Sequence, residues 1–84
     1  MAKLLYFAWV RQKIGKAEEE LALPEGISTI GELTEELAKR GPGYAAAFRN
    51  RDSIRCAINQ EHRTFDTAIK DSDEIAFFPP VTGG

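Results

Sequence analysis

The feature that most constrains this chain is a double proline that directly follows a hydrophobic run. The run, Glu74–Phe78, is rich in the apolar and aromatic residues typical of strands. Pro79 and Pro80 lack the backbone N–H groups that a continuing strand needs, so the strand must end before them. We therefore expect residues 1–78 to form the folded domain and residues 79–84 to leave it as an extended tail.

The tail continues through Val81 and Thr82 to Gly83 and Gly84. Glycine carries no side chain and accepts backbone angles that other residues refuse, so this tip can thread a narrow slot in another protein. Five residues extend by at most about 17 Å, which is enough to enter a partner's active site. The alternative is a frayed terminus without function, because terminal residues are often disordered.

Length and composition predict a single domain with one modest core, because the chain has 84 residues and 43% hydrophobic content. The net charge of -2 gives no electrostatic reason to expect nucleic acid or an anionic membrane as partner. A single cysteine, Cys56, excludes an internal disulfide and fits a reducing compartment. We find no signal peptide and no apolar run long enough to cross a membrane, and expect a cytoplasmic protein.

The first part of the chain predicts a hairpin of two strands. Lys3–Val10 reads as a central strand because both of its faces are apolar in the middle. Glu18–Leu23 is more charged, as an edge strand should be. Gly15, in the intervening turn, is the residue expected at positive φ.

Alternation along the first strand places Leu5, Phe7 and Trp9 on one face, which we expect to be the outer one. An exposed apolar patch of this kind often marks a partner site. Coverage of this face by the domain itself is the alternative. The last strand, if it lies beside the first, would point Ile75 and Phe77 inward and add Phe78 to the outer patch.

A helix is predicted from a capping box, in which Thr29 and Glu32 each satisfy the other's backbone N–H. It should run to about Arg40, with Gly41 as its C-terminal cap. Its apolar residues fall on one stripe at helical spacing and are expected in the core. These core residues are Ile30, Leu33 and Leu37.

The second half of the chain predicts shorter elements. Residues 44–48 should form a helical turn that plugs one end of the core, and residues 49–53 a polar loop. Ile54–Asn59 reads as a third strand that buries Cys56 as a small hydrophobe, and residues 64–65 as a very short strand. His62 has no further ligands at suitable spacing, so we expect a surface or partner-facing residue and no metal site.

These elements predict an α+β fold in which one main helix packs on one face of a mixed sheet of four to five strands. The helix crossover should lead to a strand parallel to the first. The chain resembles the ubiquitin-like β-grasp family, and within it the small, sulfur-carrier subunits of molybdopterin synthase. Three segments carry the resemblance, of which the last is the most specific. They are Lys3–Gly15, Cys56–Gln60 and Asp71–Gly84.

The resemblance implies a chemistry for the tail. An ATP-dependent adenylyltransferase, similar to ubiquitin-activating enzymes, would adenylate the Gly84 carboxylate. A sulfur donor protein would then convert Gly84 to a thiocarboxylate. The large catalytic subunit of molybdopterin synthase would take in the tail and use the sulfur to form the dithiolene of molybdopterin. ATP is consumed by the activating partner, and no cofactor is expected on this chain.

The resemblance also implies a binding surface. Phe7 and Phe78 would pack on the large subunit, with His62 near the same face, and the tail from Pro79 through Thr82 would enter the partner. Ser72 stands where the family usually has glycine, which bears on a turn and not on the chemistry. The chain would be a non-catalytic subunit of a sulfurtransferase, in a heterotetramer of two small and two large subunits.

Three other functions stay open. The chain could be a sulfur carrier of another pathway, such as thiamine synthesis. It could be a ubiquitin-like modifier joined through Gly84 to lysines of target proteins. It could also be an interaction module whose tail is inert.

Overall fold

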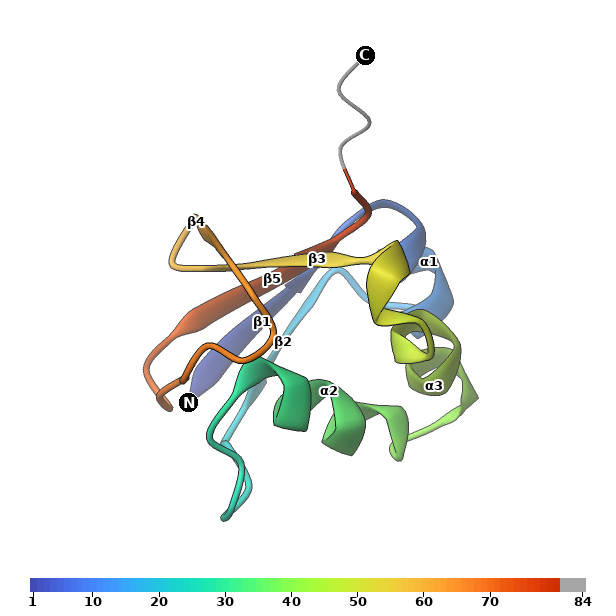
Figure 1. Ribbon diagram of the computed structural model, residues 1–84. Coiled ribbons are helices and arrows are strands. Elements are labelled where there is room, and N and C mark those ends of the chain that lie inside the picture. Colours follow the sequence, from blue (N-terminus) through green and yellow to red (C-terminus); the bar gives the residue numbers. More distant parts are fainter. Residues whose placement is uncertain (81–84) are drawn as a thin grey trace.

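The computed structural model describes residues 1–80, which form a mixed five-stranded sheet with helices packed on one of its faces (Figure 1). The strand order is β2-β1-β5-β3-β4. The strands are β1 Ala2–Tyr6, β2 Glu18–Leu21, β3 Arg55–Ile58, β4 Glu61–Arg63 and β5 Glu74–Phe78. The helices are α1 Ala8–Ile14, α2 Ile30–Ala38 and α3 Pro42–Phe48, with a short 3-10 helix at Arg51–Ser53.

The sheet confirms a central β1 and an edge β2, which pair as an antiparallel hairpin. On its other side β1 pairs in parallel with β5. β3 pairs antiparallel with both β5 and β4. The strand that directly follows the helices, β3, runs antiparallel to β5 and therefore opposite to β1, so the expectation of a parallel strand directly after the helix crossover was wrong. The strand that does run parallel to β1 is β5.

The core lies between the helices and the sheet face that they cover, which we call the covered face. Ile75 and Phe77 of β5 are fully buried there, as alternation predicts. The Phe77 ring packs edge-on against Phe48 of α3, with ring centroids 5.0 Å apart, and stacks near Tyr6 of β1. The predicted helix residues Ile30, Leu33 and Leu37 and the strand residue Cys56 are buried in the same core.

The first strand is shorter than predicted, because the chain turns into helix α1 directly after β1. Phe7 stays extended and caps the helix, and its carbonyl oxygen accepts a hydrogen bond from Val10 N–H at 3.1 Å. Ala8 turns the chain with a φ of 52°, a left-handed conformation that alanine seldom adopts. Trp9 therefore belongs to α1. Gly15 ends this helix with a φ of 92°, which confirms its predicted positive φ.

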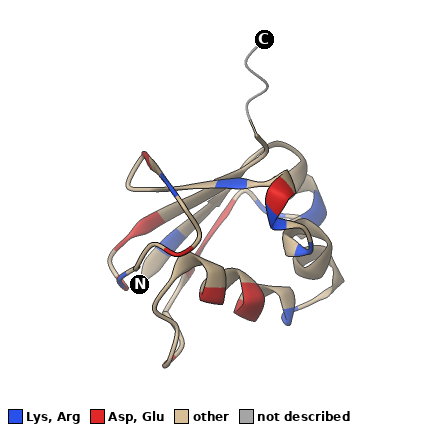
Figure 2. Cartoon of the chain, viewed as in Figure 1, with Lys and Arg blue, Asp and Glu red and all other residues tan. Residues whose placement is uncertain are grey.

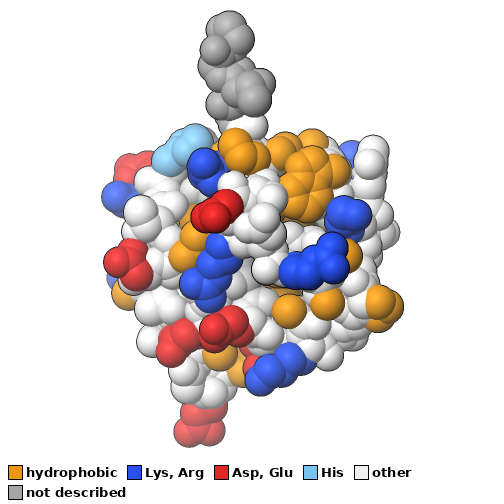
Figure 3. All heavy atoms as spheres, turned by 45° about the vertical axis from the view of Figure 1, so that its right-hand side comes forward, with side chains coloured by type: hydrophobic (Ala, Val, Ile, Leu, Met, Phe, Trp, Pro, Cys, Tyr) orange, Lys and Arg blue, Asp and Glu red, His pale blue; other side chains and the backbone are white. Residues whose placement is uncertain are grey.

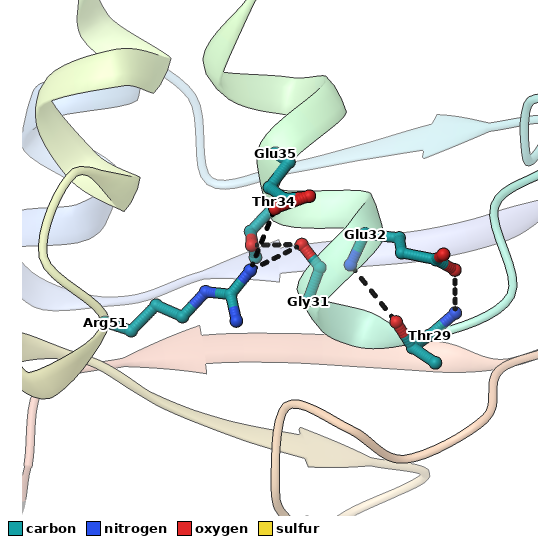
Figure 4. Close-up of polar contacts among 6 residues, drawn as sticks. All are labelled: Thr29, Gly31, Glu32, Thr34, Glu35 and Arg51. Carbon is teal, nitrogen blue, oxygen red and sulfur yellow. Dashed lines mark hydrogen bonds and ion pairs between the residues drawn. The ribbon is translucent and has the colours of Figure 1, made fainter.

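Helix α2 begins at the predicted capping box (Figure 4). Glu32 N–H donates to Thr29 Oγ1 at 3.2 Å, and Thr29 N–H donates to Glu32 Oε1 at 3.1 Å. The predicted C-cap was wrong, because Lys39 caps α2 in a right-handed conformation. Gly41 instead precedes α3 as its N-cap, with Pro42 in the first turn, where a missing N–H has no cost.

Arg51, from the segment predicted as a polar loop, holds the start of α2 (Figure 4). Its Nη2 donates to the Gly31 carbonyl at 3.1 Å and lies 3.5 Å from the Glu35 carboxylate. Its guanidinium also lies 5.5 Å from the centroid of the Phe65 ring. A Cβ at Gly31 would lie 3.1 Å from the guanidinium nitrogens, so the glycine leaves room for this contact.

The short strand expected at residues 64–65 was misplaced, because β4 occupies Glu61–Arg63. Asn59 and Gln60 form the preceding turn with φ values of 51° and 73°. This pair of positive angles matches the twist of a tight hairpin and fixes β4 beside β3. The predicted α+β fold is confirmed, although α1 and α3, of seven residues each, accompany the main helix α2. No helix within residues 1–80 is long and apolar enough to cross a bilayer.

Candidate functional site at the end of β5

The sheet brings Phe7 and Phe78 to the same end of the molecule, because parallel β1 and β5 both finish there. Phe7 N–H donates to the Phe77 carbonyl at 3.1 Å, so the residue after β1 stays attached to β5. The Phe7 side chain is 48% exposed, and only Met1 is a comparably exposed large hydrophobe among residues 1–80. Phe78 is half-buried. An apolar side chain of this size, exposed beside the root of the tail, can anchor a partner.

His62 joins this end of the sheet from β4. Its ring lies edge-on to that of Phe78, with centroids 5.1 Å apart. Register pairs place His62 opposite Ala57, Ala57 opposite Ala76, and Ala76 opposite Leu5. These side chains share the sheet face opposite the helices, which we call the open face. It has an apolar centre and a histidine at its edge, which suits protein binding.

The tail leaves the domain at the end of this arrangement. Pro79 and Pro80 follow β5 and are half-buried. The other residues of the tail predicted to act, Val81, Thr82, Gly83 and Gly84, lie outside the described residues. The structure therefore shows only the first two residues of the tail, which we call the tail root. The tail root lies between the open face and the helical side of the molecule (Figure 1).

Trp9, predicted on the outer patch, lies elsewhere because α1 carries it to the helical side of the tail root. There it lines a hollow of about 550 Å³ together with Pro80. The hollow is also lined by Lys13, which sequence reasoning did not select, and by Arg49, which it placed in a polar loop. A helical reading of residues 8–14 would have put Trp9 and Lys13, four positions apart, on one face.

The described residues offer no activated nucleophile at this end of the molecule. Burial raises the pKa of the Cys56 thiol to about 11, so the thiol is protonated at neutral pH. Its Sγ lies 3.1 Å from the Arg63 carbonyl oxygen, to which it donates a hydrogen bond. Within residues 1–80 no cluster of histidine, cysteine and acidic side chains could hold a metal ion. The described residues at this end can bind a partner protein and hold the root of the tail in a fixed place.

A polar cluster on the covered face ties β1, β2 and α3 together. Glu19 accepts hydrogen bonds from Tyr6 Oη and Tyr44 Oη, both at 2.7 Å. Burial of Glu19 acts to raise its pKa, but the tyrosine hydrogen bonds and nearby Lys16 outweigh burial and hold the pKa below its usual value. The ionised carboxylate therefore stabilises the folded state.

Comparison with known proteins agrees with this architecture over the whole chain. Residues 4–84 match the model of the ThiS family. This chain belongs to the ThiS family. A relative named molybdopterin synthase sulfur carrier subunit, from Haemophilus influenzae, is 39% identical over 84 residues and covers 100% of both chains. The resemblance to the small subunits of molybdopterin synthase is therefore confirmed by a full-length sequence match.

Solved structures give the same result for the fold of this ThiS family member. A putative molybdopterin converting factor subunit 1 from Pyrococcus furiosus superposes with a TM-score of 0.75 at 35% identity, covering 95% of this chain and 97% of the other. Small archaeal modifier protein 1 from Methanosarcina acetivorans superposes with a TM-score of 0.70 at 26% identity, covering 99% and 95%. The predicted ubiquitin-like β-grasp fold is confirmed.

Proposed function

We propose that this chain is the sulfur carrier subunit of a molybdopterin synthase and that it donates sulfur from the carboxyl group of Gly84. The observation that carries the proposal is the full-length match to a relative of that name. The geometry supports it, because the domain presents the tail root beside an exposed apolar side chain.

The chemistry begins with the carboxylate, which is a poor electrophile because its anion repels nucleophiles and its oxygen leaves badly. Attack of a Gly84 carboxylate oxygen on the α-phosphate of ATP releases pyrophosphate and gives an acyl adenylate. Hydrosulfide delivered by the donor protein then attacks the carbonyl carbon, the bond from that carbon to the AMP oxygen breaks, AMP leaves with the electron pair, and loss of the S–H proton gives the thiocarboxylate. The resulting thiocarboxylate is itself a nucleophile, as anionic sulfur is.

The domain contributes binding and positioning to this sequence of steps. β5 fixes the point from which the tail emerges, and the backbone angles of Pro79 and Pro80 keep its first residues extended. Phe7 and Phe78 pack on the large catalytic subunit, with His62 beside them. The adenylyltransferase, the sulfur donor and the large subunit supply the catalytic groups, the ATP and the sulfur, and this chain supplies the reacting carboxyl group of Gly84, so this subunit is a cosubstrate. We place the assembly, a heterotetramer, in the cytoplasm.

Deletion of Gly84 tests the proposal. Because the tip carries the reacting carboxylate, we expect sulfur transfer to the precursor of molybdopterin to be lost in a reconstituted synthase assay. The melting temperature should stay nearly unchanged, since terminal residues contribute little to packing. Full sulfur transfer by the shortened chain would contradict the carrier role, and a large loss of stability would contradict a free tail.

Protein modification is the second candidate function, favoured by the structural match to small archaeal modifier protein 1. In that case Gly84 would be joined to lysine side chains of target proteins. Slowly migrating conjugates that disappear on deletion of Gly84 would support it. A carrier of thiamine type would share the tail chemistry, and the large subunit that copurifies with the chain separates the two carrier roles.

A further inference from the structure

We propose that the basic hollow beside Pro80 receives an acidic side chain of the large synthase subunit when that subunit takes in the tail. The inference rests on the proposed function, because it describes a second contact made by the same partner. It concerns the helical side of the tail root, whereas Phe7, Phe78 and His62 belong to the end of the sheet.

The hollow is built where α1, α3 and the segment after α3 meet the end of β5. Trp9 and Pro80 form apolar walls, and Ala47, which is buried, lies at its base. The view in Figure 3 brings this side forward and shows basic side chains below a group of hydrophobic ones near the end of the described chain. Its full lining is Trp9, Lys13, Ala46, Ala47, Arg49, Asn50, Ser53 and Pro80.

The shape of the hollow is set by backbone packing. α3 approaches α1 so closely that a Cβ at Gly43 would lie 2.3 Å from the Lys13 carbonyl oxygen. Only glycine permits this approach, which sets the spacing of α1 and α3, the helices that contribute half of the lining residues.

The charge of the residues that line the hollow is positive. Lys13 and Arg49 are both exposed and are the two charged residues of its lining. Within residues 1–80 neither has a carboxylate at ion-pair distance, which is also true of Arg11, Arg40, Arg55 and Lys70. Figure 2 shows acidic residues on β2, on α2 and at the start of β5, and also in the 3-10 helix next to the hollow, where Asp52 lies. The lining thus presents two free cations and two apolar walls to whatever covers the tail root.

The position of the hollow selects its occupant. Pro80 is both a wall of the hollow and the residue from which the remaining tail continues. A protein that encloses the tail must therefore pass over the hollow. The chemistry that fits is a carboxylate between Lys13 and Arg49, carried on a loop with an apolar residue against Trp9. Arginine can hold a carboxylate with two parallel hydrogen bonds, so Arg49 is the stronger of the two contacts.

Binding of the full-length chain to purified large subunit, measured by calorimetry at low and at high salt, tests this. Arg49→Glu reverses one charge at the hollow. Lys70→Glu reverses one charge just before β5, at the opposite end of that strand from Pro80. We expect Arg49→Glu to weaken binding about tenfold at low salt and less at high salt, because exposed charge pairs are screened. Lys70→Glu should stay within about twofold of the unaltered chain.

A third variant tests whether a side chain of the large subunit enters the hollow or is only attracted by the charges at its surface. Ala46→Gln fills the hollow without a change of charge, and we expect weaker binding at both salt concentrations. Thermal melts show that each variant is folded. Equal affinities of Arg49→Glu and Lys70→Glu at low salt, or unchanged binding of folded Ala46→Gln, would overturn the inference. No binding by the unaltered chain would instead overturn the proposed function, and the inference with it.

Discussion

The two sides of β5 differ in what they contact. On the covered face Ile75 and Phe77 are fully buried, and Phe77 packs against aromatic rings from α3 and β1. On the open face Phe78 is half-buried and meets the His62 ring from an edge strand. One strand of alternating residues thus serves both the core and the binding surface. The tail starts directly after this strand, at Pro79.

Because the two faces make different contacts, stability and binding can be changed separately in this fold. Contacts of the covered face are made within the domain, so their loss should appear in the free energy of unfolding. Side chains of the open face have free surface left for a partner, so their loss should appear in affinity. Matched substitutions on the two faces, measured by stability and by affinity, test whether this division holds.

The largest effect is expected from Phe77→Ala on the covered face. Removal of a fully buried ring leaves a cavity, and we expect a loss of about 3–5 kcal/mol in the free energy of unfolding. Phe78→Ala removes the same atoms from the open face and should cost about 1 kcal/mol. Urea denaturation of both variants checks this. Equal losses would contradict the division between the faces.

Gly43→Ala should be the next most damaging to stability. The added methyl group would meet the backbone at Lys13 and push α3 away from α1, at a cost of about 1–3 kcal/mol. Gly41→Ala is the matched control, because nothing lies within 4 Å of a Cβ there and its φ of 167° is extended backbone. Thermal melts of the pair should show a clear drop for Gly43→Ala and a small change for Gly41→Ala. A reversed order would refute the close contact.

Phe7→Ala and Phe78→Ala test the open face as a partner surface. If both rings are buried anchors in the complex, each substitution should weaken binding to the large subunit by about 1–3 kcal/mol. Calorimetry with the purified large subunit measures this. Phe7 is already exposed in the free chain, so Phe7→Ala should hardly change the melting temperature. Unchanged affinity in both variants would exclude this face from the interface.

The smallest effect is expected at Glu19, and it depends on pH. The folded state holds the Glu19 pKa below the reference value of 4.5, so its contribution is complete above that pH and is lost as the pH falls through the folded pKa. Glu19→Gln should cost about 1 kcal/mol at neutral pH. Its stability should then change less between pH 5 and pH 3 than that of the unaltered chain. Parallel pH profiles in urea denaturation would show that the carboxylate contributes nothing.

Local signals predicted much of the covered face. The capping box at Thr29 and Glu32 located the start of α2, and alternation in Glu74–Phe78 gave the burial of β5. Both patterns depend on neighbouring residues alone, which is why they can be read without the fold. Gly15 was likewise predicted at positive φ, because a turn that needs this angle favours glycine.

The strand-to-helix switch at Ala8 could not be predicted in this way. Its left-handed φ is normally marked by glycine or asparagine, and here an alanine adopts it within a run of strand-forming residues. Helix α1 is stabilised by its packing on α3, a contact between distant segments. Because residues 8–10 were predicted as strand, the hollow could not be predicted either, since Trp9 and Lys13 lie on one face only if they belong to a helix. The prediction of Gly41 as the C-cap of α2 was wrong for a related reason, since Gly41 is instead the N-cap of α3.

Fragment-resolved mass spectrometry of the C-terminal peptide tests the central claim most directly. The full chain is incubated with ATP, a competent activating enzyme and a sulfur donor, and the peptide that contains Gly84 is sequenced. Whole-protein mass would not suffice, because oxidation of Met1 or Cys56 adds nearly the same mass as exchange of oxygen for sulfur. We expect sulfur on the carboxyl group of Gly84. An unmodified Gly84, with an enzyme that activates a known carrier in the same conditions, would contradict it.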